Sequence, residues 1–336
     1  MVSIQKNFSL KNYNTFGINV FASSFIEYTN INTLNELFIN EAFNSIFFVL
    51  GGGSNVLFTN NFNGLIIYPQ NKGIEIIEEN NETVLLRIAA GEEWDKVVEY
   101  AVNNLFYGIE NLSLIPGNIG AAPIQNIGAY GIEIKDSIKY VDFFNTISGK
   151  IEQLNNSDCK FGYRDSIFKN ELKNKIVVTN VYIQLSKVEN YHIDYGNIKD
   201  ELKKVEVINL KIVRDAVINI RKNKLPDPAI IGNAGSFFKN PIISKQLLKE
   251  IQADFAEVPY YDIDVCQVKI PAGWLIEKCG FKGMKKGNAG VHDKQALVLV
   301  NHGNATSNEI LELSDEIIAK IQNRFGISLE TEVNII

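Results

Sequence analysis

The segment that most constrains this chain is Ile115–Gly131, IPGNIGAAPIQNIGAYG, which we call the small-residue segment. Small side chains stand at Gly117, Gly120, Ala121, Ala122, Gly128, Ala129 and Gly131, and amides stand at Asn118, Gln125 and Asn126. A backbone this bare can lie flat against a planar, polar ligand while the amides contact the edge of that ligand. Because a structural loop rarely needs so many small residues at once, the segment predicts a binding site.

A second glycine-rich motif, GGGSN, occupies Gly51–Asn55. It does not match the dinucleotide-binding fingerprint, because its sixth position is Val56 and we expect a strand rather than a helix to follow. The successive backbone N–H groups of such a turn suit a pyrophosphate. A plain glycine hairpin is the alternative interpretation.

A third motif, GNAGSFFKNP at Gly232–Pro241, places Ser236 between a bendable run and two phenylalanines. Such a stretch suits a site that needs close backbone approach, a hydroxyl and an apolar wall. The alternative is a simple turn that the phenylalanines anchor in the core.

The composition is that of a folded protein with room for two or three domains: 336 residues, 46% hydrophobic and 21% charged. The net charge of −6 without a basic block argues against nucleic acid as the main partner. An odd number of cysteines without close spacing fits a reducing cytoplasm. We find no apolar run suited to a signal peptide, and prolines within 112–132 exclude a membrane helix there.

Metal and serine-triad chemistry are not indicated. His192, His292 and His302 lie in separate segments and form no ligand pair at helical spacing. No serine sits in a G-x-S-x-G elbow. We therefore expect no metal site.

The hydrophobic pattern divides the chain into three parts. Residues 1–70 read as strand, helix, strand, turn and strand, and alternating runs from about Ile74 predict antiparallel strands. The prolines of KLPDP mark a boundary before the third part. Thr306 or Ser307 can cap a long last helix, and Gly326 can end it. Helical patterns are expected at 32–43, 92–105, 200–222 and 306–326.

In their order and spacing, the motifs resemble the UDP-N-acetylenolpyruvoylglucosamine reductase family over essentially the whole chain. They are NTFG, GGGSNVLF, LIPGNIGAAPIQNIGAYG, FGYRDSIFK, KLPDP, GNAGSFFKNP, AGWLIEKCG, QALVLVN and LETEV. The resemblance implies an α+β fold of three domains. Two of them would form an FAD-binding unit of the vanillyl-alcohol-oxidase type, and one would bind substrate.

The domain boundaries implied are residues 1–70 and 71–218 for the two parts of the FAD-binding unit, and 219–326 for the substrate-binding domain. Residues 327–336 are expected to return to the second FAD-binding part as a strand. That strand is expected to be short, because the chain stops four residues after Glu332.

The resemblance also implies a reaction in two steps, in which NADPH reduces bound FAD and leaves. UDP-N-acetylglucosamine enolpyruvate then accepts a hydride at C3 from flavin N5 and a proton at C2, which gives UDP-N-acetylmuramate. The reaction would serve peptidoglycan synthesis, and with it cell wall formation, cell shape and cell division. We expect a cytoplasmic monomer that binds neither nucleic acid nor a membrane.

Both glycine-rich motifs are expected to hold FAD, at the pyrophosphate and at the isoalloxazine. Asn118 stands where the family pattern has a smaller residue, which could alter a contact to a flavin phosphate. The residues implied are Gly51, Gly52, Gly53, Ser54, Asn55, Ile115, Pro116, Gly117, Asn118, Gly120, Ala121, Gln125, Asn126, Gly128, Ala129 and Tyr130.

Three residues match the family's catalytic positions. Ser236 would donate the proton to C2, and Arg164, in YRDS, would bind the substrate carboxylate and the developing enolate. Glu332, in ETEV, would act on the opposite side of the enol. Without the resemblance, a salt bridge to Asp165 would explain Arg164, and an ordinary charge on a strand face would explain Glu332.

A further set matches the substrate-binding positions. Tyr195 lies in an insertion between Asn190 and Leu202 that marks the longer subclass of the family, which carries a tyrosine loop. A solvent-exposed loop tyrosine is the alternative. The residues implied are Tyr195, Lys224, Asn240, Tyr261 and Gln295.

Two other functions compete with this one. An alcohol or sugar oxidase of the same FAD fold often attaches its flavin through a histidine, and neither glycine-rich motif contains one. A non-catalytic nucleotide-binding module is the second rival, and it would lack the yellow colour of a flavoprotein.

Overall fold

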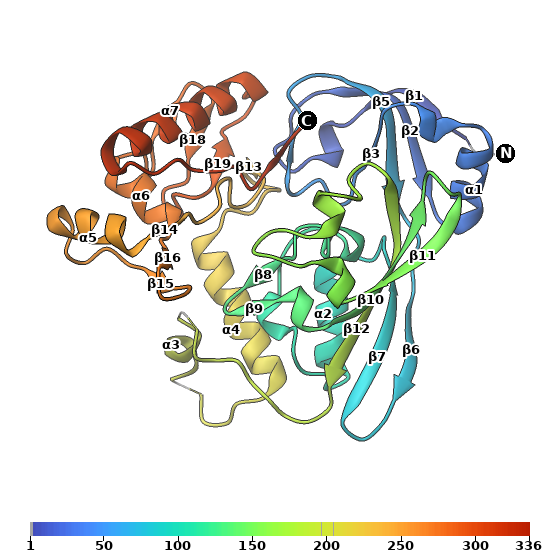
Figure 1. Cartoon of the computed structure of the whole chain (residues 1–336), viewed down its shortest axis with the longest axis horizontal. Coiled ribbons are helices and arrows are strands. Elements are labelled where there is room, and N and C mark those ends of the chain that lie inside the picture. The colour runs from blue at the N-terminus through green and yellow to red at the C-terminus, as the bar shows by residue number, and fades with distance from the viewer. Residues whose placement is uncertain (1–2, 196, 204) are drawn as a thin grey trace. The chain divides into compact units, whose positions relative to one another are not determined.

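The computed structural model describes residues 3–195, 197–203 and 205–336 (Figure 1). Contacts within the chain divide it into two units, each built from three stretches of sequence. The first unit comprises Met1–Phe8, Phe21–Gly52 and Phe62–Asn223, and the second comprises Ser9–Val20, Gly53–Asn61 and Lys224–Ile336. The main division, between Asn223 and Lys224, lies at the start of KLPDP and five residues after the expected boundary between 218 and 219.

A four-stranded sheet with a helix packed on it forms one part of the first unit. The helix α1 (Ile31–Ile39) begins at Asn30, whose side chain accepts a hydrogen bond from the N–H of Asn32. Leu34 and Leu37 of this helix pack against apolar side chains of the sheet. The strand order is β1 (Gln5–Ser9), β2 (Phe21–Tyr28), β5 (Phe62–Pro69) and β3 (Phe47–Val49), with β2 and β3 both parallel to β5.

The other part of the first unit is a five-stranded antiparallel sheet, as the alternating pattern predicts. Figure 1 shows β10, β12 and β7 running beside one another. The order is β11 (Lys150–Asn155), β10 (Ile138–Asn145), β12 (Ile176–Ser186), β7 (Thr83–Ala89) and β6 (Ile74–Glu79).

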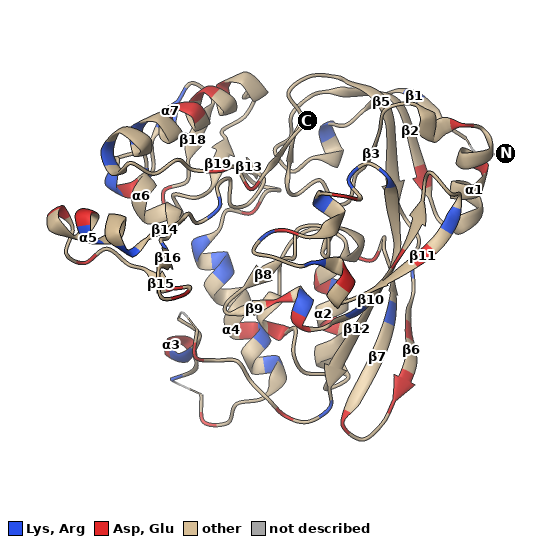
Figure 2. Cartoon of the chain, viewed as in Figure 1, with Lys and Arg blue, Asp and Glu red and all other residues tan. Residues whose placement is uncertain are grey.

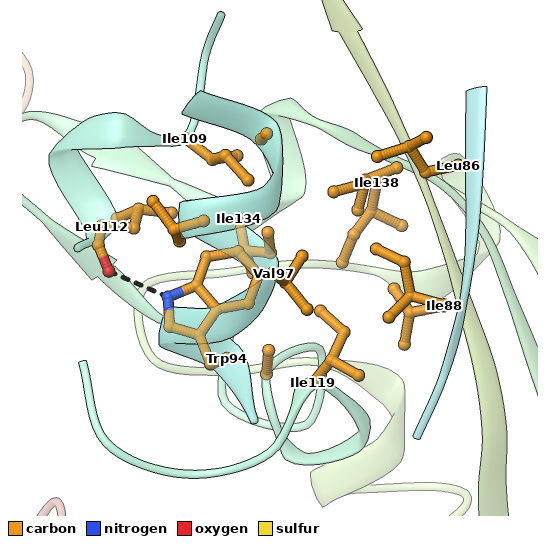
Figure 3. Packing of buried hydrophobic residues seen from close by; sticks show 14 of the residues in the cluster. Leu86, Ile88, Trp94, Val97, Ile109, Leu112, Ile119, Ile134 and Ile138 are labelled. Carbon is orange, nitrogen blue, oxygen red and sulfur yellow. Dashed lines mark hydrogen bonds between the residues drawn. The ribbon is translucent and has the colours of Figure 1, made fainter. Parts of the chain in front are cut away.

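Helix α2 (Trp94–Asn103) packs its apolar face on this sheet. Trp94 is 1% exposed, and its indole N–H donates to the carbonyl of Leu112 at 2.8 Å (Figure 3). Ile119 and Ile134 belong to the same buried cluster. Because Ile119 is part of the small-residue segment, that segment is anchored directly in the core of the first unit.

Two further helices, α3 (Ile198–Leu202) and α4 (Leu210–Lys224), complete the first unit. Figure 2 shows basic residues recurring along α4. Val213, Val217 and Ile220 pack α4 against α3 in a separate apolar cluster.

The second unit contains three α-helices, two small sheets of three and four strands, and a two-stranded pairing at the end of the chain. The last helix has the caps predicted for it: Thr306 and Glu309 form a capping box, and Gly326 ends the helix in a left-handed conformation. The helices are α5 (Lys245–Asp254), α6 (Ala272–Lys278) and α7 (Ser307–Phe325). The sheets are β13 (Gly232–Asn233), β19 (Leu299–Asn301), β18 (Ala289–Val291) and β17 (Lys285–Lys286), and β14 (Ile242–Ser244), β16 (Gln267–Lys269) and β15 (Tyr261–Asp262).

The end of the chain pairs with a different partner from the one expected. The short strand β20 (Asn334–Ile335) lies parallel to β4 (Val56–Leu57), within the second unit, and not beside a strand of residues 71–218. Val56 and Leu57 are buried, so the pairing covers an apolar strand whose edge would otherwise need another partner. Along the described stretches of the chain, no helix is both long enough and apolar enough to cross a membrane.

Candidate active site

The backbone of the small-residue segment is irregular and turns repeatedly into the left-handed region. Leu114, immediately before it, has a φ of 59°, and Asn126 and Tyr130 have φ values of 45° and 49°. Residues other than glycine adopt this conformation at a cost and only when their surroundings enforce it, which is common at functional sites. Gly117 and Gly131 have φ values of 117° and 84°, where glycine carries no such cost.

Part of the small-residue requirement comes from packing between the two glycine-rich motifs. A Cβ on Gly52 would lie 2.8 Å from the Cα of Gly117, and one on Gly120 would lie 2.6 Å from the Cβ of Ala90. Gly51 approaches Ala121 in the same way, at 3.4 Å. Both motifs must therefore be nearly bare for their backbones to meet within the first unit.

The amide of Asn118 is used inside the fold. Its side-chain N–H donates to the carbonyl of Gly91 at 2.9 Å, and backbone bonds from Ile119 and Gly120 to Glu92 and Ala90 continue the same attachment. The side chain of Asn118, which is larger than the residue that the family pattern has at this position, thus links the small-residue segment to the turn before α2.

Arg164 joins the small-residue segment from the YRDS loop. Its guanidinium donates to the carbonyl of Gly128 at 2.7 Å and to that of Asn126 at 3.3 Å. A Cβ on Gly128 would lie 3.1 Å from the nearer guanidinium nitrogen, so glycine makes this approach possible. Arg164 itself is held at a φ of 56°, and Asp165 accepts a hydrogen bond from Asn170.

Asn126 departs from the sequence interpretation. Its side chain is fully buried, donates to Glu133 and to the carbonyl of Gly162, and accepts from the N–H of Lys135. An amide committed in this way cannot contact the edge of a ligand. Its contribution to the site is to fix the turn from which its carbonyl reaches Arg164.

A buried ion pair fixes the start of the small-residue segment. Both carboxylate oxygens of Asp95 accept hydrogen bonds from Arg214, at 2.8 and 2.9 Å, and one also accepts from the N–H of Leu114 at 2.5 Å. Burial would raise the pKa of Asp95, but the bonds from Arg214 and Leu114 outweigh burial and lower the pKa. This pair ties α4, α2 and the strained turn at Leu114 together.

Tyr130, at the other end of the segment, has two neighbours that the sequence analysis did not single out. The side-chain N–H₂ of Asn111 donates to the carbonyl of Tyr130 at 3.0 Å. Burial raises the pKa of the Tyr130 hydroxyl, and the nearby guanidinium of Arg221 opposes that rise. Neither neighbour had a local sequence signal: Asn111 lies in a single 3-10 turn, Glu110–Leu112, and Arg221 is a charged residue whose Nε is buried near the end of α4.

Tyr195 lies against this end of the segment. The position of a Cβ on Gly131 would be 3.3 Å from the Cβ of Tyr195 and 3.4 Å from its ring. Tyr195 is 43% exposed. Gly196, which follows Tyr195 in the sequence of this loop, is outside the described residues.

In the second unit, strand-like pairing brings the loop that carries Ser236 beside residues 330–332. The residue after Ser236, Phe237, accepts a hydrogen bond from the N–H of Glu332 at 2.8 Å, and Lys239 donates to the carbonyl of Glu330 at 2.9 Å. Phe237 and Phe238 are 0% and 1% exposed. The phenylalanines therefore anchor the loop in the core, while Ser236 of this loop and Glu332 of the paired stretch are both half-buried.

The turn before Ser236 is supported by the NTFG motif. The hydroxyl of Thr15 donates to the carbonyl of Asn233 at 2.6 Å, and Asn233 accepts from the N–H of Gly235. Gly235 has a φ of 69°, and nothing lies within 4 Å of where its Cβ would be. Among the described residues, open space therefore borders Gly235, the residue before Ser236.

The substrate-binding candidates of the second unit lie around α6 and its neighbouring sheet. Asn240 accepts from the N–H of Ala272 at 2.9 Å, and the side-chain oxygen of Gln295 is 3.1 Å from the Cβ position of Gly273. Tyr261 is 46% exposed on β15. Lys224 is exposed at the end of α4.

The candidates therefore fall into two sets. The first unit holds Arg164, Tyr195, the small-residue segment, Gly51 and Gly52. Within the second unit, Asn55 donates to the carbonyl of Glu332 at 3.3 Å. The second unit also holds Gly53, Ser54, Lys224, Ser236, Asn240, Tyr261 and Gln295.

Comparison with known proteins decides the family. Residues 227–336 match the family described as UDP-N-acetylenolpyruvoylglucosamine reductase, C-terminal domain, and residues 39–155 match the one described as FAD binding domain. The chain is 46% identical to UDP-N-acetylenolpyruvoylglucosamine reductase of Bacteroides fragilis (strain YCH46). The match covers 99% of this chain and 100% of that protein. The chain belongs to the UDP-N-acetylenolpyruvoylglucosamine reductase family. A member of this family from Flavobacterium johnsoniae is 48% identical, with 100% of both chains covered.

Solved structures agree on the fold. UDP-N-acetylenolpyruvylglucosamine reductase from Thermus caldophilus superposes with a TM-score of 0.69 at 21% identity, covering 100% of this chain and 98% of that one. p-Cresol methylhydroxylase reaches a TM-score of 0.52 at 10% identity, covering 96% and 84%. With the FAD-binding domain match, these likenesses confirm the predicted α+β fold with an FAD-binding unit of the vanillyl-alcohol-oxidase type.

The residues of the first unit fit FAD. The backbone at Gly128 and Ala129 is half-buried, carries almost no side chain and lies beside the Arg164 guanidinium, as a planar polar ring would require. Neither glycine-rich motif contains an acidic residue, which suits an anionic pyrophosphate.

Proposed function

We propose that this chain reduces UDP-N-acetylglucosamine enolpyruvate to UDP-N-acetylmuramate with NADPH and bound FAD. Full-length similarity to the reductase family supports the reaction, and the FAD-binding domain match supports the cofactor. The structural observation that carries the proposal is the backbone pairing between the loop of Ser236 and the stretch of Glu332, which joins the N–H of Glu332 to the carbonyl of Phe237. When bound, FAD supplies hydride transfer from NADPH to the C3 carbon of the enolpyruvyl group.

The chain's glycine-rich motifs hold the cofactor. Gly51–Asn55 would receive the pyrophosphate at its backbone N–H groups. The small-residue segment, from Ile115 to Tyr130, would receive the isoalloxazine. The buried Asp95–Arg214 pair and Asn126 keep this surface in place before any ligand arrives.

Ser236 supplies the proton to C2 from its hydroxyl. A serine hydroxyl is a weak acid in water, so the transfer needs a site that stabilises the developing charge and returns a proton to the serine. We assign that exchange to Glu332, and the backbone bond from its N–H to the carbonyl of Phe237 supports the assignment by joining its stretch to the Ser236 loop. The buried phenylalanine side chains restrict the backbone of the loop that carries the hydroxyl.

Arg164 binds the carboxylate of the enolpyruvyl group and stabilises the enolate. Its guanidinium is planar and permanently charged, and the carbonyls of Asn126 and Gly128 fix its plane. An arginine oriented in advance loses little freedom when it binds a carboxylate, which favours the charged state of the reaction.

The UDP part of the substrate would be bound by the remaining candidates. Lys224 offers an exposed ammonium for the diphosphate, and Tyr195 offers a phenol beside the small-residue segment. The others are Asn240, Tyr261 and Gln295. We further propose that the enzyme acts as a cytoplasmic monomer in peptidoglycan synthesis, and so supports cell wall formation, cell shape and cell division.

An anaerobic half-reaction experiment tests the proposal. The purified protein should be yellow, and NADPH should bleach it. Addition of UDP-N-acetylglucosamine enolpyruvate should then restore the oxidised flavin spectrum with formation of UDP-N-acetylmuramate. A colourless protein would support a nucleotide-binding module, and reoxidation by oxygen but not by the UDP-sugar would support an oxidase.

A further inference from the structure

One buried side chain links the small-residue segment to the loop that carries Tyr195. Asn111 is 1% exposed, and its N–H₂ group donates to two carbonyls, that of Tyr130 at 3.0 Å and that of His192 at 2.7 Å. Tyr130 ends the set of proposed FAD contacts, and His192 begins the loop three residues before Tyr195. A single amide therefore bridges a cofactor-binding stretch and a substrate-binding loop.

The orientation of this amide shows which of its atoms matters. Its side-chain oxygen is buried without a hydrogen-bond partner, which carries a desolvation cost. The opposite orientation would point that oxygen at two carbonyl oxygens and leave both without a donor. The side chain is thus retained for its two N–H donors, and the two carbonyls are held close only because the donors lie between them.

Two neighbouring contacts show what the bridge positions. The Tyr195 side chain packs on Gly131, directly after Tyr130. Tyr191 and Ile193, on either side of His192, pack with Tyr130 against the α3–α4 cluster. The loop base is therefore docked on the end of the small-residue segment, and Asn111 supplies the directional part of that docking.

We propose that Asn111 is a positioning residue for Tyr195. It holds the loop base against Tyr130, so that the phenol is presented to the UDP-sugar without first paying the entropy of ordering the loop. This inference rests on the proposed function, because it assigns Tyr195 to substrate binding. Asn111 itself contacts neither ligand.

The test is a double-mutant cycle in the flavin-loaded enzyme. Asn111→Asp keeps the shape of the side chain but replaces the two donors with an oxygen. It should raise the Michaelis constant for UDP-N-acetylglucosamine enolpyruvate by roughly tenfold or more, the scale for two lost buried hydrogen bonds. Flavin content should not change. In a Tyr195→Ala background the same substitution should change the constant less than about twofold, because coupled residues are not additive.

Asn104→Asp is the matched control. Asn104 also donates to one backbone carbonyl, that of Tyr100 at 2.8 Å, but it is exposed at the end of α2. Asn104→Asp should leave the Michaelis constant for UDP-N-acetylglucosamine enolpyruvate unchanged. An equal effect of Asn111→Asp in both Tyr195 backgrounds would overturn the proposal, and so would an unchanged Michaelis constant in the single variant.

A second measurement does not depend on turnover or on a charged variant. Asn111→Ala should speed amide hydrogen exchange in residues 191–195 of the flavin-loaded protein relative to wild type and Asn104→Ala. Unchanged exchange would refute the bridge even if the enzyme is active. Faster exchange in a protein that does not reduce the UDP-sugar would leave the bridge intact and refute the proposed function instead.

Discussion

The small-residue segment of the first unit and the Ser236 loop of the second are built on opposite principles. The segment is shaped by missing side chains and left-handed residues, and buried polar groups such as Asp95 and Asn126 hold it. The Ser236 loop is shaped by backbone pairing with residues 330–332 and by two buried phenylalanines. A surface that binds a cofactor needs a backbone without bulky side chains, whereas a proton donor needs one side chain in a fixed place.

This contrast separates two kinds of vulnerability. Substitutions around the segment should disturb stability and flavin binding, because the atoms that matter are in the backbone. Substitutions of the half-buried side chain of Ser236 should disturb chemistry alone, because the backbone pairing that holds the loop does not involve that side chain.

The largest expected effect is that of Ser236→Ala. Reoxidation of the reduced flavin by the UDP-sugar should slow by roughly two to four orders of magnitude, the usual scale for a positioned acid. Reduction of the flavin by NADPH should stay near the wild-type rate, since that half-reaction delivers no proton to substrate. Stopped-flow absorbance measures both steps. Equal losses in both would make the loop's role structural.

Asp95→Asn should instead lower the stability of the first unit. Removing one member of a pair whose arginine is 9% exposed leaves a buried charge, and should lower the free energy of unfolding by about 3 kcal/mol. Flavin retention should fall with it, because the turn at Leu114 loses its anchor. Urea unfolding followed by tryptophan fluorescence measures the first effect.

The same variant has a defined pH dependence. The pKa of Asp95 is lowered in the folded state from its ordinary value of 3.8. Its stabilising contribution is therefore complete above that value and disappears as the pH falls through the lower, folded value. The stability gap between wild type and Asp95→Asn should be constant from pH 7 to about 5 and narrow below pH 4. A gap that widened in acid would contradict the assignment.

A pair of glycine substitutions compares the two regions directly. Gly52→Ala places a Cβ 2.8 Å from the Gly117 backbone and should cost about 2 kcal/mol, with weaker flavin binding. Gly235→Ala meets nothing within 4 Å and should cost only about 1 kcal/mol, for its left-handed φ. Thermal unfolding with and without added FAD would show whether Gly52→Ala, unlike Gly235→Ala, changes the stabilisation that FAD gives.

Lys224→Ala should affect ligand binding and leave the flavin in place. NADPH and the UDP-sugar each carry a diphosphate, and we propose that one ammonium serves both. The Michaelis constants for both ligands should rise by roughly tenfold for the lost charged hydrogen bond, while the flavin content stays constant. Tyr195→Phe should change them less, since only a hydroxyl is removed. Unaltered constants for both ligands in Lys224→Ala would refute the shared role.

Local patterns predicted the regular elements well. The apolar face of α2, including Trp94 and Val97, is buried, and Thr306 and Gly326 cap α7 as expected. Each of these signals depends on residues within one or two turns of helix, where propensity and capping act. The glycines and prolines of the small-residue segment also indicated its irregular backbone.

Other features depended on distant partners and left no local signal. The pairing of β20 with β4 joins strands at opposite ends of the sequence, and either strand alone is only two residues long. Asn126 was read as a ligand contact because its exposure cannot be inferred from its neighbours; a left-handed turn directs its amide inward. Asn111 gave no sign of its two carbonyl partners, one of which is 81 residues away.

The construction of the second unit from three stretches sets an order on its synthesis. The hydroxyl of Thr15 bonds a carbonyl 218 residues later in the chain, and that of Thr59 bonds one 277 residues later. Both early stretches leave the ribosome long before their partners exist, and contacts this distant in sequence form slowly. The nascent chain must therefore carry apolar residues such as Phe16 and Leu57 uncovered until its final third emerges, a period in which a chaperone would find its binding sites.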